Sequence, residues 1–183
     1  MFNKYSRLII TLSFCLIFMA YGIYLKNINS KKYNSVDEYV LKNFPKIDSF
    51  KKLDNSNFVL DKNSNYDGIV VHFWATWCGP CESELPEFLN FSARFDKLLY
   101  LVIASKDDVV KVRKFLSRFD KIQNNVIFLQ DPDGVLMRDF GTLRLPETYL
   151  FDKNLGMLKK FVGPQSWNNE FFHSNFNYLF SSF

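Results

Sequence analysis

A pair of cysteines two residues apart, directly after a buried-strand pattern, is the feature that most constrains how this chain folds. The run Trp77-Cys78-Gly79-Pro80-Cys81 follows the apolar stretch 69–73, which is interrupted only by His72. A short apolar run of this kind predicts a buried β-strand. Pro80 suits the first turn of a helix, because its missing N–H forfeits no helical hydrogen bond there. The two sulfurs are therefore expected at a strand-to-helix junction, where they can close into a disulfide.

The sequence supplies few further ligands for a metal centre. The third cysteine, Cys15, lies in an apolar N-terminal segment, and the two histidines are His72 and His173. Structural zinc sites use four ligands, and the spacing of these residues fits no zinc-finger pattern. The dithiol is thus predicted to be redox-active, with no metal and no cofactor.

The expected helix gives the two thiols different chemistry. At its first turn, Cys78 meets unpaired backbone N–H groups and the positive end of the helix dipole, which lower the pKa of a thiol. Cys81 lies one turn further in and is placed to attack a mixed disulfide formed through Cys78. Glu84 follows on the same helical face, where partial burial would raise its pKa and let it accept the proton of Cys81. The alternative for Glu84 is a solvated glutamate on the helix surface, which composition alone favours. His72 is the second candidate for that proton, and the alternative for His72 is a packed core histidine.

Strand and helix signals alternate from Phe50 onward, which predicts an α/β domain with a mixed central sheet flanked by helices. The hydrophobic fraction of 48% is enough for a core that does not depend on disulfides. The net charge of +4 is modest, and without a basic run nucleic-acid binding has no support. The expected strands are 57–60, 69–73, 98–104, 126–129, 147–151 and 157–162, and the expected helices are 80–95, 107–119, 135–140 and 167–180. Asp107 or Asp108 is expected to cap the start of the helix 107–119.

The N-terminus has the character of a membrane anchor. Residues 8–25 carry no charge, and as a helix they would span ~27 Å, close to the thickness of the hydrocarbon core of a bilayer. No convincing small-x-small cleavage site follows, so a cleaved signal peptide is the weaker alternative. The predicted organisation is a signal anchor or transmembrane helix over 1–25, a polar linker over 26–49 and the α/β domain over 50–183.

Three stretches together resemble one protein family. They are residues 71–81 (VHFWATWCGPC), Glu84-Leu85-Pro86 and residues 145–152 (LPETYLFD). In combination they are similar to thioredoxin-fold proteins, and more narrowly to the membrane-anchored thiol–disulfide oxidoreductases of the TlpA/ResA/CcmG (DsbE) type. The resemblance covers the chain from about Phe50 to its end and implies a thioredoxin-like fold.

The resemblance also implies roles for single residues. Pro146 is expected to be a cis-proline that faces the dithiol, and the backbone of Leu145 to pair with an extended substrate segment. Trp77 is expected to cover the dithiol, and Glu84 matches the buried acid of this family. His72 departs from the Asp or Asn usual at its position.

The activity implied is the reduction of disulfides in apocytochrome c or similar exported proteins. A membrane electron donor would re-reduce the dithiol, and the chain would cross the bacterial inner membrane once, with its catalytic domain on the periplasmic side. Two alternatives stay open. One is a general periplasmic oxidant of thiols, and the other is a copper-binding assembly factor that uses both thiols and His173.

Overall fold

The structure is a computed structural model that describes residues 17–23, 41–61, 64–170, 173–174, 176 and 180. The chain divides into two units, 1–40 and 41–183. In the first unit, residues 17–23 form a helix with exposed side chains. The rest of the predicted anchor and most of the predicted linker lie outside the described residues. Within the part of the chain that is described, no helix is both long enough and apolar enough to span a bilayer.

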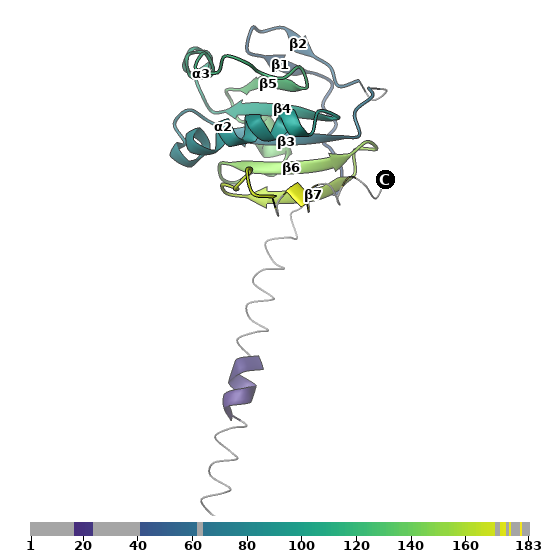
Figure 1. Ribbon diagram of the computed structural model, residues 1–183, viewed down its shortest axis with the longest axis vertical. Coiled ribbons are helices and arrows are strands. Elements are labelled where there is room, and N and C mark those ends of the chain that lie inside the picture. Colours follow the sequence, from purple (N-terminus) through teal and green to yellow (C-terminus); the bar gives the residue numbers. More distant parts are fainter. Residues whose placement is uncertain are drawn as a thin grey trace, which may run out of the picture. The chain divides into compact units, whose positions relative to one another are not determined.

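A seven-stranded mixed sheet forms the centre of the second unit (Figure 1). Its elements are β1 (Phe50–Lys52), β2 (Asn57–Phe58), β3 (Gly68–Trp74), α2 (Gly79–Arg94), β4 (Leu98–Ser105), α3 (Val109–Leu116), β5 (Val126–Asp131), α4 (Val135–Asp139), β6 (Glu147–Asp152) and β7 (Met157–Val162). The strand order is β2-β1-β5-β4-β3-β6-β7. Strands β3, β4 and β5 are parallel, and the other pairs are antiparallel.

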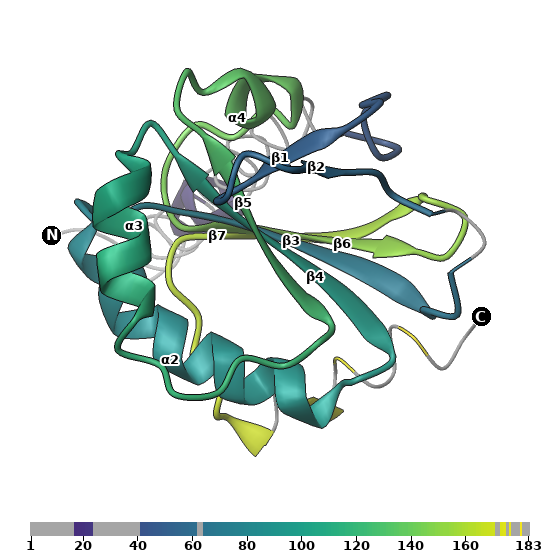
Figure 2. The same ribbon diagram turned by 90° about the horizontal axis from the view of Figure 1, so that it is seen from above.

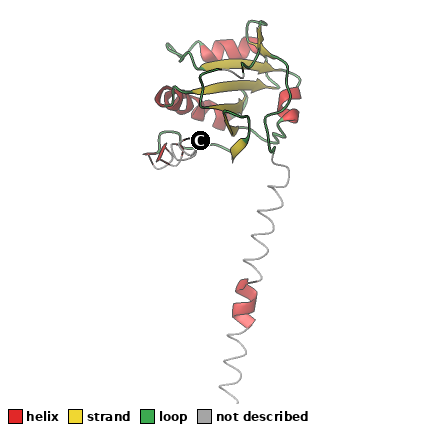
Figure 3. Cartoon of the chain, turned by 90° about the vertical axis from the view of Figure 1, so that its right-hand side faces the viewer, coloured by secondary structure: helices red, strands yellow, loops and turns green. Residues whose placement is uncertain are grey.

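Helices cover both faces of the sheet (Figure 3). Helices α2 and α3 lie on one side and α4 lies on the other (Figure 2). Strand β3 is buried along its whole length because both of its faces are covered. Val70 and Trp74 pack in the core beneath α2 and α3, whereas Val71 and Phe73 pack in the core beneath α4. This two-sided burial explains the continuous apolar run, and it places the side chain of His72 on the α2 side.

Sequence features at the starts of α2 and α3 predict where these two helices begin. Helix α2 begins directly after Cys78 and contains Pro86, as predicted. Asp108 caps α3, since its carboxylate accepts hydrogen bonds from the backbone N–H groups of Val110 (2.8 Å) and Lys111 (3.1 Å). This cap was expected at Asp107 or Asp108, and the structure assigns it to Asp108.

Other elements differ from the prediction. Strand β1 was not predicted, because a three-residue strand leaves almost no alternating pattern. Its register is set by pairing with β5 and β2. The predicted helix 167–180 begins later, because Trp167 lies in a turn with its side chain fully buried, and the described helical residues start at Glu170.

Residues 41–49, which the sequence assigns to the linker, lie with the second unit. The Phe44 ring is only 9% exposed, and it packs edge-on against Phe140 (5.3 Å between ring centroids) and Phe151 (5.0 Å). The backbone N–H of Phe44 donates to the carbonyl of Leu155 at 2.9 Å. An aromatic ring buried in this way ties its segment to the core.

Candidate active site

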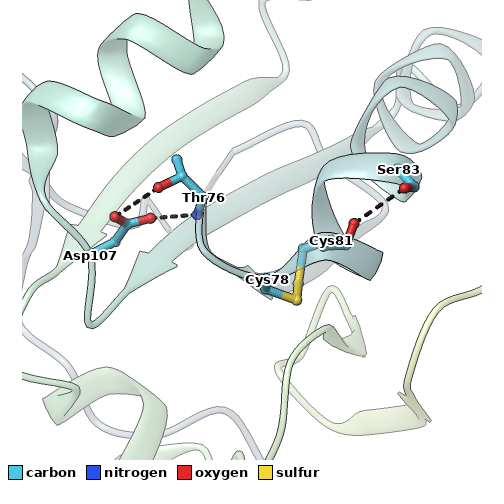
Figure 4. Close-up of a disulfide and its surroundings, with 6 residues drawn as sticks. Thr76, Cys78, Cys81, Ser83 and Asp107 are labelled. Atoms are coloured by element: carbon cyan, nitrogen blue, oxygen red, sulfur yellow. Dashed lines mark hydrogen bonds between the residues drawn. A yellow bond between two sulfur atoms is a disulfide. The ribbon is translucent and has the colours of Figure 1, made fainter.

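Cys78 and Cys81 are joined by a disulfide at the start of α2 (Figure 4). Their Cα atoms lie 5.2 Å apart, inside the range that a disulfide bridges without backbone movement. Cys78 is the N-cap residue of the helix and keeps 7% of its surface exposed, whereas Cys81 is fully buried. A partner that approaches the pair therefore meets Cys78.

The loop before the dithiol is tied to the end of β4. The backbone N–H and the hydroxyl of Thr76 both donate to the carboxylate of Asp107, at 2.5 and 3.0 Å (Figure 4). The indole N–H of Trp77 donates to the carbonyl of Lys106 at 2.9 Å. These three bonds fix the backbone that leads into Cys78, while the side chain of Trp77 stays 61% exposed.

Glu84 lies one turn after Cys81 and is 4% exposed. Its Oε1 accepts a hydrogen bond from the indole N–H of Trp167, and its Oε2 is buried without a hydrogen-bond partner in the described part of the chain. Burial raises the pKa of Glu84 to about 7, and the bonds from Trp167 and the Gln165 backbone offset part of that rise. A carboxyl group with this pKa exchanges its proton at neutral pH.

His72 is packed into the core. Its ring is fully buried and stacks on Phe88, with 4.3 Å between centroids. Its Nδ1 lies 2.9 Å from the hydroxyl of Thr148, and its Nε2 is buried with no hydrogen-bond partner among the described residues. Burial lowers the pKa of His72 to about 3, so the imidazole is neutral at physiological pH. These are the surroundings of a core histidine, the alternative that the sequence left open for this residue.

Trp167 is a site residue that the sequence did not reveal. It lies 83 positions after Glu84, and its indole is the hydrogen-bond donor to that carboxylate. The same ring packs edge-on against Phe88 (4.9 Å) and His72 (6.5 Å). The sequence around Trp167 does not predict this contact, because its partners lie on elements that are distant in the chain.

The peptide bond between Leu145 and Pro146 is cis, as the resemblance implied. Phe73 in β3 pairs with Glu147 in β6, so Pro146 lies at the same end of the sheet as the residues that lead to Cys78. Pro146 is buried, Leu145 is partly buried, and the neighbouring Leu143 is 81% exposed. An exposed apolar side chain therefore lies close in sequence to the cis bond.

No group of three or more metal-ligating side chains occurs among the residues that the structure describes. His173, the possible copper ligand, is 6% exposed. Its Nδ1 lies 2.8 Å from the guanidinium of Arg94, and its Nε2 lies 2.5 Å from the carbonyl of Trp167. Both ring nitrogens are thus engaged with protein atoms.

Known proteins are similar to this chain over most of the second unit. The family model described as Redoxin matches residues 40–177. The thiol-disulfide oxidoreductase ResA of Bacillus thuringiensis subsp. konkukian is 27% identical over 101 residues, which cover 54% of this chain and 57% of that protein. The thiol:disulfide interchange protein DsbE of Pseudomonas aeruginosa is 30% identical over 122 residues, 67% of this chain and 66% of that protein. The chain thus spans only part of the length of these relatives.

Solved structures share the fold. A thioredoxin-like protein from Aeropyrum pernix superposes with a TM-score of 0.58 and 15% identity, covering 87% of this chain and 99% of that one. The strand order, the flanking helices and this superposition confirm the predicted thioredoxin-like α/β fold.

Proposed function

The chain belongs to the redoxin family, and we propose that it is a thiol–disulfide oxidoreductase that reduces disulfides of exported proteins through Cys78 and Cys81. One observation carries the proposal. A disulfide lies at the N-terminus of α2, where Cys78 is 7% exposed, Cys81 is fully buried and Glu84 follows a turn further along. The names of the similar proteins, which include thiol-disulfide oxidoreductases, support this reaction class.

The first step is an attack by Cys78 on the substrate. In the reduced protein, the Cys78 thiolate attacks one sulfur of a substrate disulfide, the substrate S–S bond breaks, and the second substrate sulfur leaves as a thiolate that takes up a proton. Backbone N–H groups in the first turn of α2 stabilise the attacking thiolate. The product is a mixed disulfide between Cys78 and the substrate.

The second step releases the substrate. Cys81 gives its proton to Glu84, and the resulting thiolate attacks the sulfur of Cys78. The mixed disulfide breaks, and the substrate sulfur leaves as a thiolate that is then protonated. The substrate has gained two electrons, and Cys78 and Cys81 are left as the disulfide. Because His72 has a pKa of about 3, we assign the proton-accepting role to Glu84 and a neutral, supporting role to His72.

Substrate binding is proposed for the surface beside the dithiol. The backbone of Leu145, next to the cis-Pro146, would pair with an extended segment of the substrate. The exposed ring of Trp77 would pack against the same segment. An extended polypeptide, rather than a small molecule, is the ligand that such an arrangement fits.

The proposed setting is the periplasmic side of the bacterial inner membrane. Residues 1–25 would anchor the chain through the uncharged stretch 8–25, and a linker would join this anchor to the catalytic domain. A membrane electron donor would return the disulfide to the dithiol. Apocytochrome c is the proposed substrate, because the motif around Pro146 resembles that of the CcmG (DsbE) type.

Trapping tests the activity and the substrate together. In a Cys81→Ala variant of the full chain, the mixed disulfide has no resolving thiol and should accumulate in a bacterial host. Non-reducing gels followed by mass spectrometry identify the bound protein, and a Cys78→Ser/Cys81→Ala double variant is the control without a nucleophile. Conjugates with apocytochrome c are the expected result. Conjugates with unrelated exported proteins alone would contradict the cytochrome role, and an absence of conjugates would contradict the activity.

The alternatives are separated by two other measurements. A midpoint potential for Cys78/Cys81 near that of thioredoxin, about −270 mV, supports a reductant, whereas a value near about −120 mV would indicate an oxidant. Stoichiometric copper binding that is lost in His173→Ala would indicate the assembly factor. The engagement of both ring nitrogens of His173 speaks against that reading.

A further inference from the structure

The acid beside the dithiol is held by a residue from the far end of the chain. We propose that Trp167 is a positioning residue that selects which oxygen of Glu84 receives the proton of Cys81, and that His173 fixes Trp167 in place. This inference rests on the proposed function of Glu84 as the proton acceptor. It assigns Trp167 and His173 a part in the redox reaction beyond packing.

The two oxygens of the Glu84 carboxyl group have different surroundings. An indole N–H can only donate, so the bond from Trp167 occupies Oε1 of Glu84 as an acceptor. The other oxygen, Oε2, is buried and has no hydrogen-bond partner among the residues that the structure describes. Glu84 and Cys81 lie three residues apart on the buried face of α2. With Oε1 engaged, Oε2 is the oxygen left to take a proton.

The indole of Trp167 is held by rings from three elements. It is fully buried, and it contacts Phe88 and Phe91 of α2 at 4.9 and 5.1 Å between ring centroids. Phe161 of β7 lies at 6.1 Å, and His72 of β3 lies at 6.5 Å. A ring packed on several sides cannot turn without displacing its neighbours. The direction of its N–H, and with it the orientation of the Glu84 carboxyl group, is fixed by the core.

The backbone of Trp167 is held by His173. The guanidinium of Arg94 is a donor only, so Nδ1 of His173 must accept from it, at 2.8 Å. The carbonyl of Trp167 is an acceptor only, so Nε2 of His173 must carry the proton that it donates. Both contacts together place the donated proton on Nε2 and the accepting lone pair on Nδ1. In this form His173 connects the position of Trp167 to Arg94 at the end of α2.

The other ionisable groups around Glu84 supply no second side-chain donor in the described part of the chain. Glu87, on the same helix, raises the pKa of Glu84 through its charge. His72 of β3 is neutral, and Tyr100 of β4, which contacts Phe88, has a pKa raised well above its usual value by burial. Trp167 and the Gln165 backbone are the two groups that lower the pKa of Glu84 by hydrogen bonding. Removing the Trp167 donor should therefore raise that pKa.

The test is a titration of Glu84 in Trp167→Phe, which removes the N–H and keeps an aromatic ring. In the purified, oxidised full chain labelled with 13C at glutamate carboxyl groups, NMR should place the midpoint of Glu84 about one pH unit higher in the variant than in the wild type. Glu84→Gln identifies the resonance. In the wild type, the indole 15N–H signal of Trp167 should titrate with the same midpoint. An unchanged Glu84 midpoint in a folded variant would overturn the proposal.

A second pair of variants keeps the test valid if Trp167→Phe does not fold. His173→Leu should shift the Glu84 midpoint upward, because the carbonyl of Trp167 loses its donor, and His173→Gln should restore much of the shift by supplying an N–H. Ser174→Ala, in the same segment, is the control expected to leave the midpoint unchanged. No shift in a folded His173→Leu variant would remove His173 from the proposal. This titration needs no substrate, so it is independent of activity. A protein without oxidoreductase activity would contradict the proposed function, whereas the Glu84 midpoint alone tests the role of Trp167.

Discussion

Two buried polar atoms near the dithiol helix, Oε2 of Glu84 and Nε2 of His72, have no hydrogen-bond partner within the described ranges of the chain. Burial acts on both residues in the same sense, because it disfavours the charged form of each. It raises the pKa of the acid to about 7 and lowers the pKa of the base to about 3. Both groups are therefore uncharged in mildly acidic solution, and Glu84 is the one that ionises as the pH passes through neutrality.

Glu84→Gln should reduce the dependence of stability on pH. The folded pKa of about 7 lies above the ordinary value of 4.5, so the wild type loses stability as the pH rises from 4.5 through 7. Glutamine has the same shape and no charge to bury. The loss of unfolding free energy between pH 5 and pH 8 should be smaller in the variant by about 2 kcal/mol, measured by urea unfolding of the oxidised chain. Equal losses in both proteins would contradict the raised pKa, and Glu82→Gln is the control on the same helix.

His72→Phe should protect the fold against acid. The folded pKa of about 3 lies below the ordinary value of 6.5, so the wild type loses stability as the pH falls from 6.5 toward 3. Phenylalanine keeps a ring on Phe88 and cannot take up a proton. Between pH 7 and pH 4.5 the variant should lose about 2 kcal/mol less than the wild type in urea unfolding. Thr148→Val removes the hydrogen bond to His72 but retains the imidazole, so this variant should stay acid-sensitive. If Thr148→Val is acid-resistant as well, protonation of His72 is not the cause of the acid sensitivity.

At the level of elements, the turn between β4 and α3 serves both the helix and the active-site loop. Asp108 caps α3, while the adjacent Asp107 holds the backbone and hydroxyl of Thr76. Lys106, at a φ of 51°, presents its carbonyl to the indole of Trp77. Two neighbouring carboxylates thus have separate tasks, one for the fold and one for the site.

Asp107→Ala and Asp108→Ala form a matched pair that separates these tasks. Each removes hydrogen bonds to one carboxylate and should lower the unfolding free energy, by about 1–2 kcal/mol. Only Asp107→Ala frees the loop before Cys78, so only this variant should change the rate at which reduced Cys78 reacts with iodoacetamide at pH 7. That rate is measured by quenching the alkylation at successive times and quantifying the modified protein by mass spectrometry. An equal change in both variants would show that the effect is one of general stability.

The elements that the sequence predicted correctly are those whose cause is local. The apolar run of β3, Pro80 at the start of α2 and the capping aspartate of α3 each lie within a few residues of the structure that they determine. The missed features depend on distant partners. Strand β1 exists because β5 and β2 pair with it, and Trp167 belongs to the site because the core places its indole against Glu84. Pattern and propensity carry no information about such contacts.

On the scale of the whole second unit, the segments before β1 and after β7 are both tied to the folded core. Residues 41–45 reach the sheet through the bridge between Asn43 and Gly156 and through the ring of Phe44. The segment that follows β7 returns to α2 through Trp167 and His173. The fold and the candidate site therefore depend on flanking segments that carry no recognisable motif.

Phe44→Ala tests where the folded unit begins. If residues 41–49 belong to it, removing a ring packed against Phe140 and Phe151 leaves a cavity and should cost about 3 kcal/mol of unfolding free energy. If they behave as a free linker, the change should cost no more than a substitution at an exposed site. Val59→Ala, at a side chain that is 64% exposed, supplies that comparison and should cost less than about 0.5 kcal/mol. Urea unfolding of both full-length variants measures these losses of unfolding free energy. Equal losses in Phe44→Ala and Val59→Ala would indicate that the folded domain begins at Phe50, as the sequence predicts.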